Sequence, residues 1–132
     1  MSYLLLYFYN KYDILYFLAK IQTECAPELI FKNFKTKVGF RLSRGLNALF
    51  PKKVDITGRR VVTFHNQRDF IFFRQHRYIF NEEFDKVTLQ ECGPRFTLRL
   101  LFIQAKTYDG EFGDYEWYYK DNMGVKRRKF YI

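Results

Sequence analysis

The chain is 132 residues long, 48% hydrophobic and 21% aromatic, and it carries a formal net charge of +9. That length fits one domain or part of one, and because the hydrophobic fraction is ordinary for a globular protein we do not expect a disordered chain. The positive charge favours a polyanionic partner, with nucleic acid ahead of an acidic membrane surface. Residues 27–105 hold 15 lysines and arginines against 7 acidic residues. We therefore expect a folded basic surface and not a mobile basic arm.

The first twenty residues are rich in apolar and aromatic side chains. The run from Tyr3 to Tyr9 is continuous, but Lys11 and Asp13 interrupt it before it resumes at Ile14. A membrane-spanning helix needs about 20 mostly apolar residues, and a secretory leader needs a basic start and a small-residue cleavage site. We therefore expect no membrane role for this segment, and predict that it packs against the core as a strand or helix.

A helix is predicted from Pro27 to Phe50, because proline suits the first helical position and Pro51 ends the pattern. Its polar positions include a basic row at Lys37, Arg41 and Arg44. Apolar residues recur every four positions and define one buried stripe: Ile30, Phe34, Val38, Leu42, Leu46 and Phe50.

Extended segments follow the helix. Residues 60–64, 70–80, 87–91 and 95–104 have the β-branched and aromatic content of strands, and residues 115–119 form a final candidate. A polar turn is expected at residues 65–69. The long segment 70–80 is the expected centre of the sheet, with Phe72 in the core. The sequence thus predicts an α+β domain in which a long basic helix packs on a mostly antiparallel, aromatic-rich sheet.

The strand after the Gly93-Pro94 break alternates between apolar and basic positions. We expect the apolar face to pack on the core and the other face to offer guanidinium groups to a ligand. The predicted core face is Phe96, Leu98, Leu100 and Phe102, and the predicted polar face is Arg95, Thr97 and Arg99.

The sequence lacks the usual catalytic and metal-binding patterns. It has no phosphate-binding glycine loop, no nucleophile elbow and no zinc-protease motif. His65 beside Asp69 has no partnered nucleophile, and Cys25 and Cys92 form no paired-cysteine motif. We therefore expect no enzyme activity, no metal, no cofactor and no small-molecule substrate. Two lone cysteines fit a reducing compartment, where they act as small buried hydrophobic residues.

Several separated blocks occur in an order that resembles a known family. They are Pro27-Glu28-Leu29-Ile30, Leu49-Phe50-Pro51, Phe64-His65-Asn66-Gln67-Arg68-Asp69, Gly93-Pro94-Arg95-Phe96 and Tyr115-Glu116-Trp117. Together they resemble the C-terminal half of a Brix domain, and within that superfamily most of all the ribosome production factor 1 family. The resemblance divides the chain into an unmatched aromatic segment, residues 1–23, and a partial Brix domain, residues 24–132. The N-terminal half of the domain is expected to be absent.

This resemblance implies a fold similar to the anticodon-binding domain of some tRNA synthetases. It also implies a nucleolar assembly factor of the large ribosomal subunit that binds pre-rRNA beside other assembly factors and catalyses no reaction. The family's RNA-binding segment corresponds to the residues around Gly93-Pro94-Arg95-Phe96.

The candidate RNA-binding residues combine the basic positions of the predicted strands and helix. Arginine and lysine contact phosphates, while neighbouring aromatic rings can stack on unpaired bases. The candidates are Arg95 and Arg99 first, then Lys37, Arg41 and Arg44, and then Arg68, Arg74 and Arg77. The alternative is a protein-interaction module of the same particle, in which the aromatic strand is the functional surface and RNA is not contacted.

Overall fold

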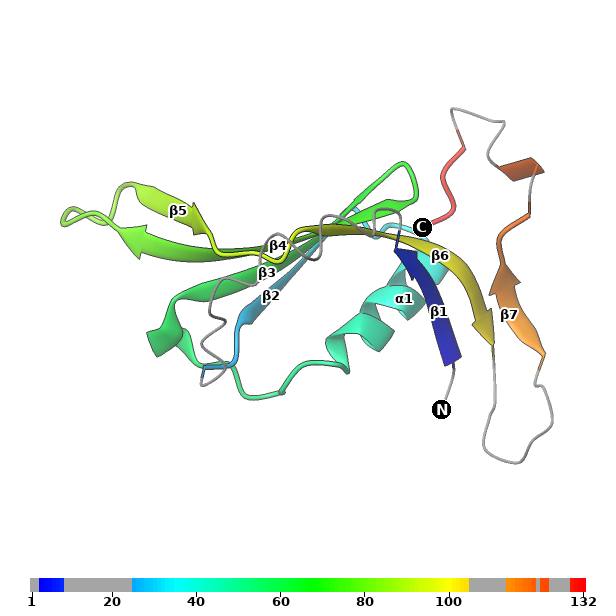
Figure 1. Ribbon diagram of the computed structural model, residues 1–132, viewed down its shortest axis with the longest axis horizontal. Coiled ribbons are helices and arrows are strands. Elements are labelled where there is room, and N and C mark those ends of the chain that lie inside the picture. Colours follow the sequence, from blue (N-terminus) through cyan, green and yellow to red (C-terminus); the bar gives the residue numbers. More distant parts are fainter. Residues whose placement is uncertain (1–2, 9–24, 105–113, 121, 124–128) are drawn as a thin grey trace.

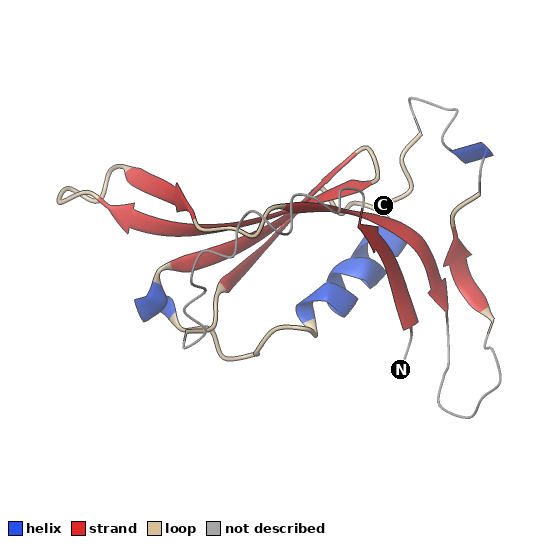
Figure 2. Cartoon of the chain, in the orientation of Figure 1, coloured by secondary structure: helices blue, strands red, loops and turns tan. Residues whose placement is uncertain are grey.

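The computed structural model describes residues 3–8, 25–104, 114–120, 122–123 and 129–132. In this part of the chain, seven strands form one sheet beside a single α-helix, α1 (Lys37–Asn47), and a short 3-10 helix, η1 (Ile56–Gly58) (Figures 1 and 2). The strands are β1 (Tyr3–Phe8), β2 (Glu28–Lys32), β3 (Arg60–Gln67), β4 (Phe70–Phe80), β5 (Val87–Glu91), β6 (Phe96–Gln104) and β7 (Tyr115–Tyr118). The α+β prediction is confirmed in a coarse form, as a mostly β fold with one short helix.

The sheet has the strand order β1-β6-β4-β3-β2, while β5 also pairs with β4 and β7 also pairs with β6. Only the β2–β3 pair is parallel among the described pairs. The predicted mostly antiparallel, aromatic-rich sheet is therefore confirmed. Stacked rings run through it, with Phe31 and Phe64 at 5.2 Å and Phe73 and Phe96 at 4.2 Å between centroids.

The predicted long helix from Pro27 to Phe50 is wrong. Its first part is strand β2, which extends alongside β3, and Asn33 ends that strand in a left-handed conformation with φ 66°. The helix begins after Thr36, whose hydroxyl oxygen accepts a hydrogen bond from the Gly39 N–H at 2.9 Å. A threonine N-cap of this kind satisfies one of the unpaired amides of the first turn. The apolar residues that recur every four positions from Ile30 therefore lie in a strand, a turn and a helix, and not in one continuous helix.

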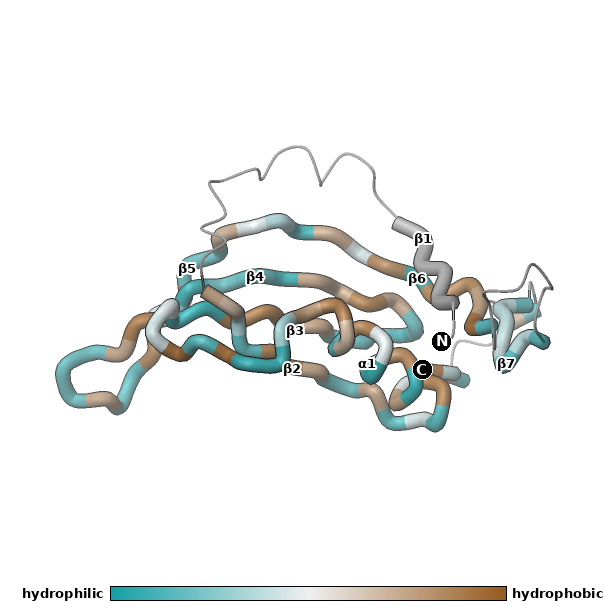
Figure 3. The backbone as a smooth tube through the Cα atoms, turned by 90° about the horizontal axis from the view of Figure 1, so that it is seen from below, coloured by the Kyte–Doolittle hydropathy of each residue, from teal (hydrophilic) through white to brown (hydrophobic). Residues whose placement is uncertain are grey.

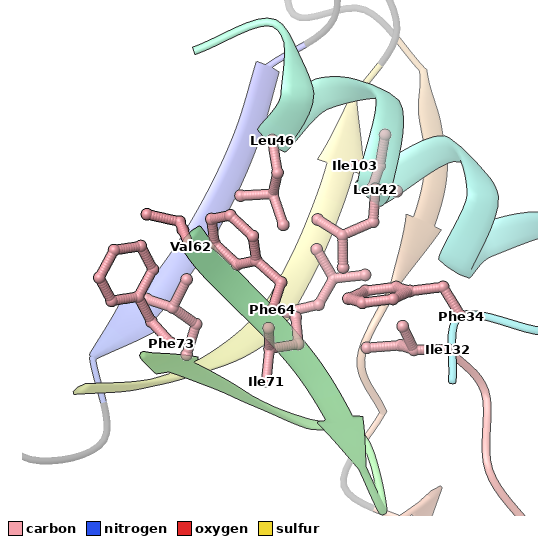
Figure 4. Packing of buried hydrophobic residues seen from close by; sticks show 11 residues of the cluster. Phe34, Leu42, Leu46, Val62, Phe64, Ile71, Phe73, Ile103 and Ile132 are labelled. Atoms are coloured by element: carbon pink, nitrogen blue, oxygen red, sulfur yellow. The ribbon is translucent and has the colours of Figure 1, made fainter. Parts of the chain in front are cut away.

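The core lies between α1 and one face of the sheet (Figure 4). Leu42 and Leu46 of the helix are 0% and 1% exposed, and they pack in one cluster with buried residues of β3, β4 and β6. Those partners are Val62, Phe64, Ile71, Phe73, Leu98, Leu100 and Ile103. Figure 3 views the molecule from below and has α1 in front of the strands. We call this covered side the helix face and the opposite side the open face.

Strand β4 has the bounds that the sequence predicts, but its covered side is the other one. Ile71 and Phe73 are buried on the helix face, while Phe72 is only half-buried on the open face. The prediction that Phe72 is a core residue is therefore wrong. Strand alternation separates two faces, but it does not say which of two aromatic faces the helix will cover.

Strand β6 departs from strict alternation near its end. The β1–β6 register shifts between Leu5 and Leu6, which leaves Leu101 as an extra residue on β6. Such a bulge turns the following side chains to the other face. Ile103 is buried in the core in place of Phe102, and the Phe102 ring instead lies 5.5 Å from the Tyr115 ring. The predicted core position of Phe102 is thus wrong.

The turn between β3 and β4 binds the C-terminal residues. The Asp69 carboxylate accepts the N–H groups of Tyr131 and Ile132 at 2.8 and 2.9 Å. The Asn66 side chain donates to the carbonyl of Ile132 at 2.8 Å, and Ile132 is 3% exposed in the core. A Cβ on Gly39 would lie 2.9 Å from the Ile132 carbonyl carbon. The helix therefore requires glycine where this tail packs.

The N-terminal segment forms a strand where the structure describes it. β1 pairs antiparallel with β6 from Tyr3 opposite Gln104 to Phe8 opposite Leu98, which confirms packing as a strand. The apolar run from Ile14 lies outside the described residues. None of the described helices has the length and apolarity that a membrane crossing requires. Cys25 and Cys92 form no disulfide, and both are half-buried, whereas we expected them to be fully buried.

Candidate nucleic-acid interface

The central part of the open face gathers aromatic, basic and histidine side chains from three adjacent strands. Antiparallel partners share a face, and the register places Phe72 opposite both His65 and Thr97, Thr63 opposite Arg74, and Phe70 opposite Arg99. We call this set the sheet-face cluster: Thr63, His65, Gln67, Phe70, Phe72, Arg74, His76, Thr97 and Arg99.

Six residues of the cluster line an open hollow of about 370 Å³. The Phe72 ring lines it beside the Arg74 guanidinium, whose Cζ lies 5.8 Å from the ring centroid. The remaining lining residues are Thr63, His65, Gln67 and His76. A partly exposed ring with hydrogen-bonding side chains around it is an arrangement that can hold an unpaired base.

Arg99 contacts two aromatic rings. Its Cζ is 5.4 Å from the centroid of Phe70 and 4.1 Å from that of Tyr119. The planar guanidinium stacks on rings and still directs its N–H groups toward an acceptor. Because the rings restrict its orientation, this cation loses less conformational freedom on contacting a phosphate than a freely rotating side chain would.

Arg74 and Arg95 share one carboxylate at the edge of the cluster. Arg95 directly precedes β6, and its Nε donates to Glu91 Oε1 at 2.7 Å while its Nη2 donates to Oε2. Arg74 Nε lies 4.0 Å from Glu91 Oε1. The hydrogen bond from Arg95 is the largest cause of the lowered pKa of Glu91. Arg95 is thus neutralised locally, so its charge is less available to RNA than that of Arg99.

The predicted helix residues lie on the other side of the sheet. Lys37, Arg41 and Arg44 are exposed on α1, which covers the helix face. Arg41 Nε and Nη2 donate to the Glu116 carboxylate at 3.0 and 3.1 Å. This hydrogen bond and the charge of Glu116 raise the pKa of Arg41. The structure therefore separates these three candidates from Arg74 and Arg99.

The last two candidates, Arg68 and Arg77, lie neither in the sheet-face cluster nor on α1. Arg68 is exposed in the β3–β4 turn with φ 55°, and Arg77 is exposed on β4 opposite Arg60. Arg77 points to the same side as Phe73 because the two are separated by an even number of residues. The predicted basic residues thus divide among the open face, the helix and the strand ends.

Sequence reasoning missed several members of the cluster. Alternation along residues 70–80 puts Phe70 and Phe72 on the same face as Arg74 and His76, which is a usable signal for a mixed aromatic and basic surface. Tyr119 offered no such signal, because it reaches Arg99 from a distant part of the sequence. The role of Asn66 and Asp69 in binding the C-terminal residues was missed for the same reason.

No group of three or more His, Cys, Asp or Glu side chains capable of holding a metal ion occurs among the residues described. Asp69, beside His65 in the sequence, accepts the two C-terminal backbone N–H groups. His65 Nε2 lies 3.1 Å from the Asn33 amide nitrogen. Both residues of this pair therefore have structural partners.

Comparisons with known proteins identify the family. The model of the Brix domain matches residues 7–101. Ribosome production factor 1 of Danio rerio is 54% identical over 114 residues, which are 86% of this chain and 34% of that protein. The Mus musculus protein of the same name is 51% identical over 114 residues, covering 86% and 32%. The Saccharomyces cerevisiae one is 44% identical over 110 residues, covering 83% and 36%.

The chain spans about a third of the length of these curated relatives. The matched residues include β3, β4 and β5 and most of β6, and therefore the whole sheet-face cluster. The chain belongs to the Brix domain family, and ribosome production factor 1 proteins are among its relatives within that family.

Proposed function

We propose that this chain binds pre-rRNA during production of the large ribosomal subunit, and that it does so through the sheet-face cluster. The relatives that it resembles are named for ribosome production. The observation that carries the RNA-binding part is the half-exposed Phe72 ring in an open hollow, with Arg74 beside it and Arg99 in contact with two rings. The proposed location is the nucleolus, beside other assembly factors, in a role without catalysis.

The proposed binding mode uses two kinds of contact. Unpaired bases stack on Phe72 and hydrogen-bond to the polar side chains of the hollow, while Arg74 and Arg99 contact the phosphates. Stacking on an aromatic ring contributes about 1–3 kcal/mol per base and tolerates different sequences. Phosphate contacts add affinity that falls with salt. This mode favours a single-stranded segment, because bases in a duplex are not free to stack on a protein ring.

The proposal includes the finer assignment of the fold. We interpret the described sheet and helix as the C-terminal half of a Brix domain, with the architecture of an anticodon-binding domain. The division between residues 1–23 and 24–132 stays a prediction. RNA binding by Arg95, Arg68, Arg77 and the helix residues Lys37, Arg41 and Arg44 also stays a prediction. We place Arg74 and Arg99 ahead of them because both lie in the sheet-face cluster.

The test is RNA affinity in two charge-matched double variants. The probe is a fluorescent single-stranded RNA of twelve nucleotides of mixed sequence, and the readout is anisotropy at several salt concentrations. Arg74→Gln with Arg99→Gln should weaken binding about tenfold or more and reduce the salt slope by about 1.4, the value for two phosphate contacts on a single strand. Lys37→Gln with Arg44→Gln removes the same charge from the exposed helix.

A larger loss in the helix variant would move the RNA to the helix face and contradict the proposal. Absence of any salt-dependent RNA binding in the parent chain would favour the alternative, a protein-interaction module without RNA contact. Circular dichroism of each variant checks that the fold is retained, so that a loss of affinity is not a loss of structure.

A further inference from the structure

The end of β4 and the whole of β5 form a hairpin that extends beyond the helix. Figure 1 shows this hairpin at the left end of the molecule, away from α1, and Figure 3 agrees from below. It carries large apolar side chains with high exposure, including Phe84 at 76% and Leu89 at 60%. In the described structure no helix covers either side of it.

Except for Ile79, the exposed apolar groups of the hairpin gather on one face. The register pairs Phe80 with Val87 and Tyr78 with Leu89, so these side chains share the open face of the sheet. The Phe84 ring lies 5.9 Å from the Phe80 ring. We call Phe80, Phe84, Val87 and Leu89 the hairpin patch. Contiguous exposed apolar groups of this kind mark interaction sites on soluble proteins.

The loop at the tip of the hairpin holds Phe84 in a defined position. Asn81 accepts the N–H groups of Phe84 and Lys86, at 3.1 and 3.2 Å, and donates to the carbonyl of Lys86 at 3.1 Å. Phe84 has φ 57°, a left-handed conformation that is unusual for a bulky residue. A strained residue that is both ordered and exposed suggests a functional constraint, since neither its own burial nor its backbone preference explains it.

The charge of the tip is opposite to that of the chain. The loop contains Glu82, Glu83 and Asp85 against one basic residue, Lys86, whereas the chain carries a net charge of +9. Carboxylates beside the patch repel the phosphates of RNA. They attract lysine and arginine. The patch thus combines an apolar face with an acidic border.

No described strand pairs with the outer edge of β5. β5 pairs with β4 through residues 87–91 on one side, and the sheet has no described strand along its other side. Such an edge offers free backbone N–H and C=O groups to an added strand. β5 carries none of the lysines or prolines that commonly protect exposed edges.

We propose that the hairpin docks an extended protein segment in which apolar residues alternate with lysine or arginine. The segment adds to the edge of β5, its apolar side chains cover the hairpin patch, and its basic side chains contact Glu82, Glu83 and Asp85. This inference is independent of RNA binding at the sheet-face cluster.

The test uses a fluorescent nine-residue peptide of alternating leucine and lysine, with a leucine–glutamate peptide as the charge control. The protein is the full chain. We expect the lysine peptide to bind despite the positive charge of the chain, and the glutamate peptide to bind at least about tenfold more weakly. Phe84→Ser with Leu89→Ser, and separately Glu82→Lys with Glu83→Lys, should each weaken lysine-peptide binding about tenfold. Arg74→Gln with Arg99→Gln should leave it unchanged.

Equal binding of the lysine peptide by the parent chain and both hairpin variants would overturn the proposal, as would failure of the parent to bind. If the hairpin variants lose RNA affinity instead, the occupant is RNA. If light scattering shows a dimer that the Phe84 and Leu89 substitutions dissociate, the occupant is a second copy. Both of these outcomes also contradict a basic protein segment as the partner.

Discussion

Strand β4 passes through two regions of the open face that differ in almost every property. Around Phe72 the face is aromatic and basic, and α1 covers its reverse side. Around Phe80 the face is apolar with an acidic border, and the described structure has no helix behind it. The first region is a helix-backed platform, to which we assign a polyanionic partner, and the second is a projecting arm, to which we assign a basic protein segment. One continuous strand thus supports two surfaces of opposite chemical character.

The difference arises from what each region has beneath it. Leu42 and Leu46 of α1 pack in one buried cluster with Ile71 and Phe73 on the helix face of the sheet. This packing holds in place the strands that carry Phe72, Arg74 and Arg99. Beyond Arg77, α1 no longer covers β4, so the exposed Phe80 and Ile79 contribute little to the stability of the fold. Exposed apolar residues in this region are better explained by a partner than by stability.

The largest effect is expected from removing the support of the platform. Leu42→Ala should lower the free energy of unfolding by about 2–5 kcal/mol, because Leu42 is 0% exposed and its loss leaves a cavity. Leu89→Ala, the same chemical change in the hairpin, should alter stability by about 0.5 kcal/mol or less. Urea unfolding followed by circular dichroism measures both. Similar losses in the two variants would mean that the hairpin belongs to the core.

A second prediction separates the two regions by ligand. Phe72→Ala should weaken binding of single-stranded RNA by about 1–3 kcal/mol, the usual contribution of one base stacked on a ring. Its effect on stability should be smaller than that of Phe73→Ala, because Phe73 is buried and Phe72 is not. Phe84→Ala is the matched control in the hairpin, and there RNA affinity should stay at the parent value. A loss with Phe84→Ala equal to that with Phe72→Ala would abolish the distinction.

The smallest effect concerns the junction of the two regions, where Glu91 of β5 bonds to Arg95. The pKa of Glu91 is lowered from its ordinary 4.5, chiefly by the hydrogen bond from Arg95. A lowered pKa in the folded state means that the stabilisation is present above the unfolded pKa and is lost as pH falls through the folded one. The parent should therefore lose stability on acidification below about pH 4.5 by more than Glu91→Gln does. The difference should be under about 1 kcal/mol for such a surface pair.

Thermal unfolding of both proteins between pH 6 and pH 3 measures that difference. Arg95→Gln serves as the control, because it removes the donor and leaves the carboxylate, and it should reduce the pH dependence in the same way. Parallel pH profiles for the parent and both variants would show that the Glu91–Arg95 contact contributes nothing to stability.

Local pattern was enough to predict some elements and not others. β4 and β5 match their predicted bounds because alternation and the flanking turn residues are signals carried within each segment. The helix was predicted too long, since the spacing from Ile30 to Phe34 imitates a helix while β2 gains its stability from parallel pairing with β3. The signal for the true start was Thr36, a good N-cap. Parallel pairing is a tertiary contact that no local window contains.

The candidate site was predictable to a similar extent. Alternation placed Arg74 beside Phe72, and Arg99 on the polar side of its strand, and the structure brings both arginines to one face. What sequence could not provide was the partner of each charge. Arg95 bonds to Glu91 and Arg41 to Glu116, whereas Arg99 contacts the rings of Phe70 and Tyr119. These partners depend on strand order, so the sequence alone could not rank the basic residues as RNA contacts.

Ultraviolet crosslinking of the full chain to a single-stranded RNA containing 4-thiouridine, with the crosslinked peptides identified by mass spectrometry, tests the central claim most directly. If RNA binds the platform, crosslinks should concentrate in the part of β4 from Phe70 to His76 and in the start of β6, with few in the hairpin tip from Asn81 to Lys86. Crosslinks concentrated in α1 or in the hairpin tip would contradict the account.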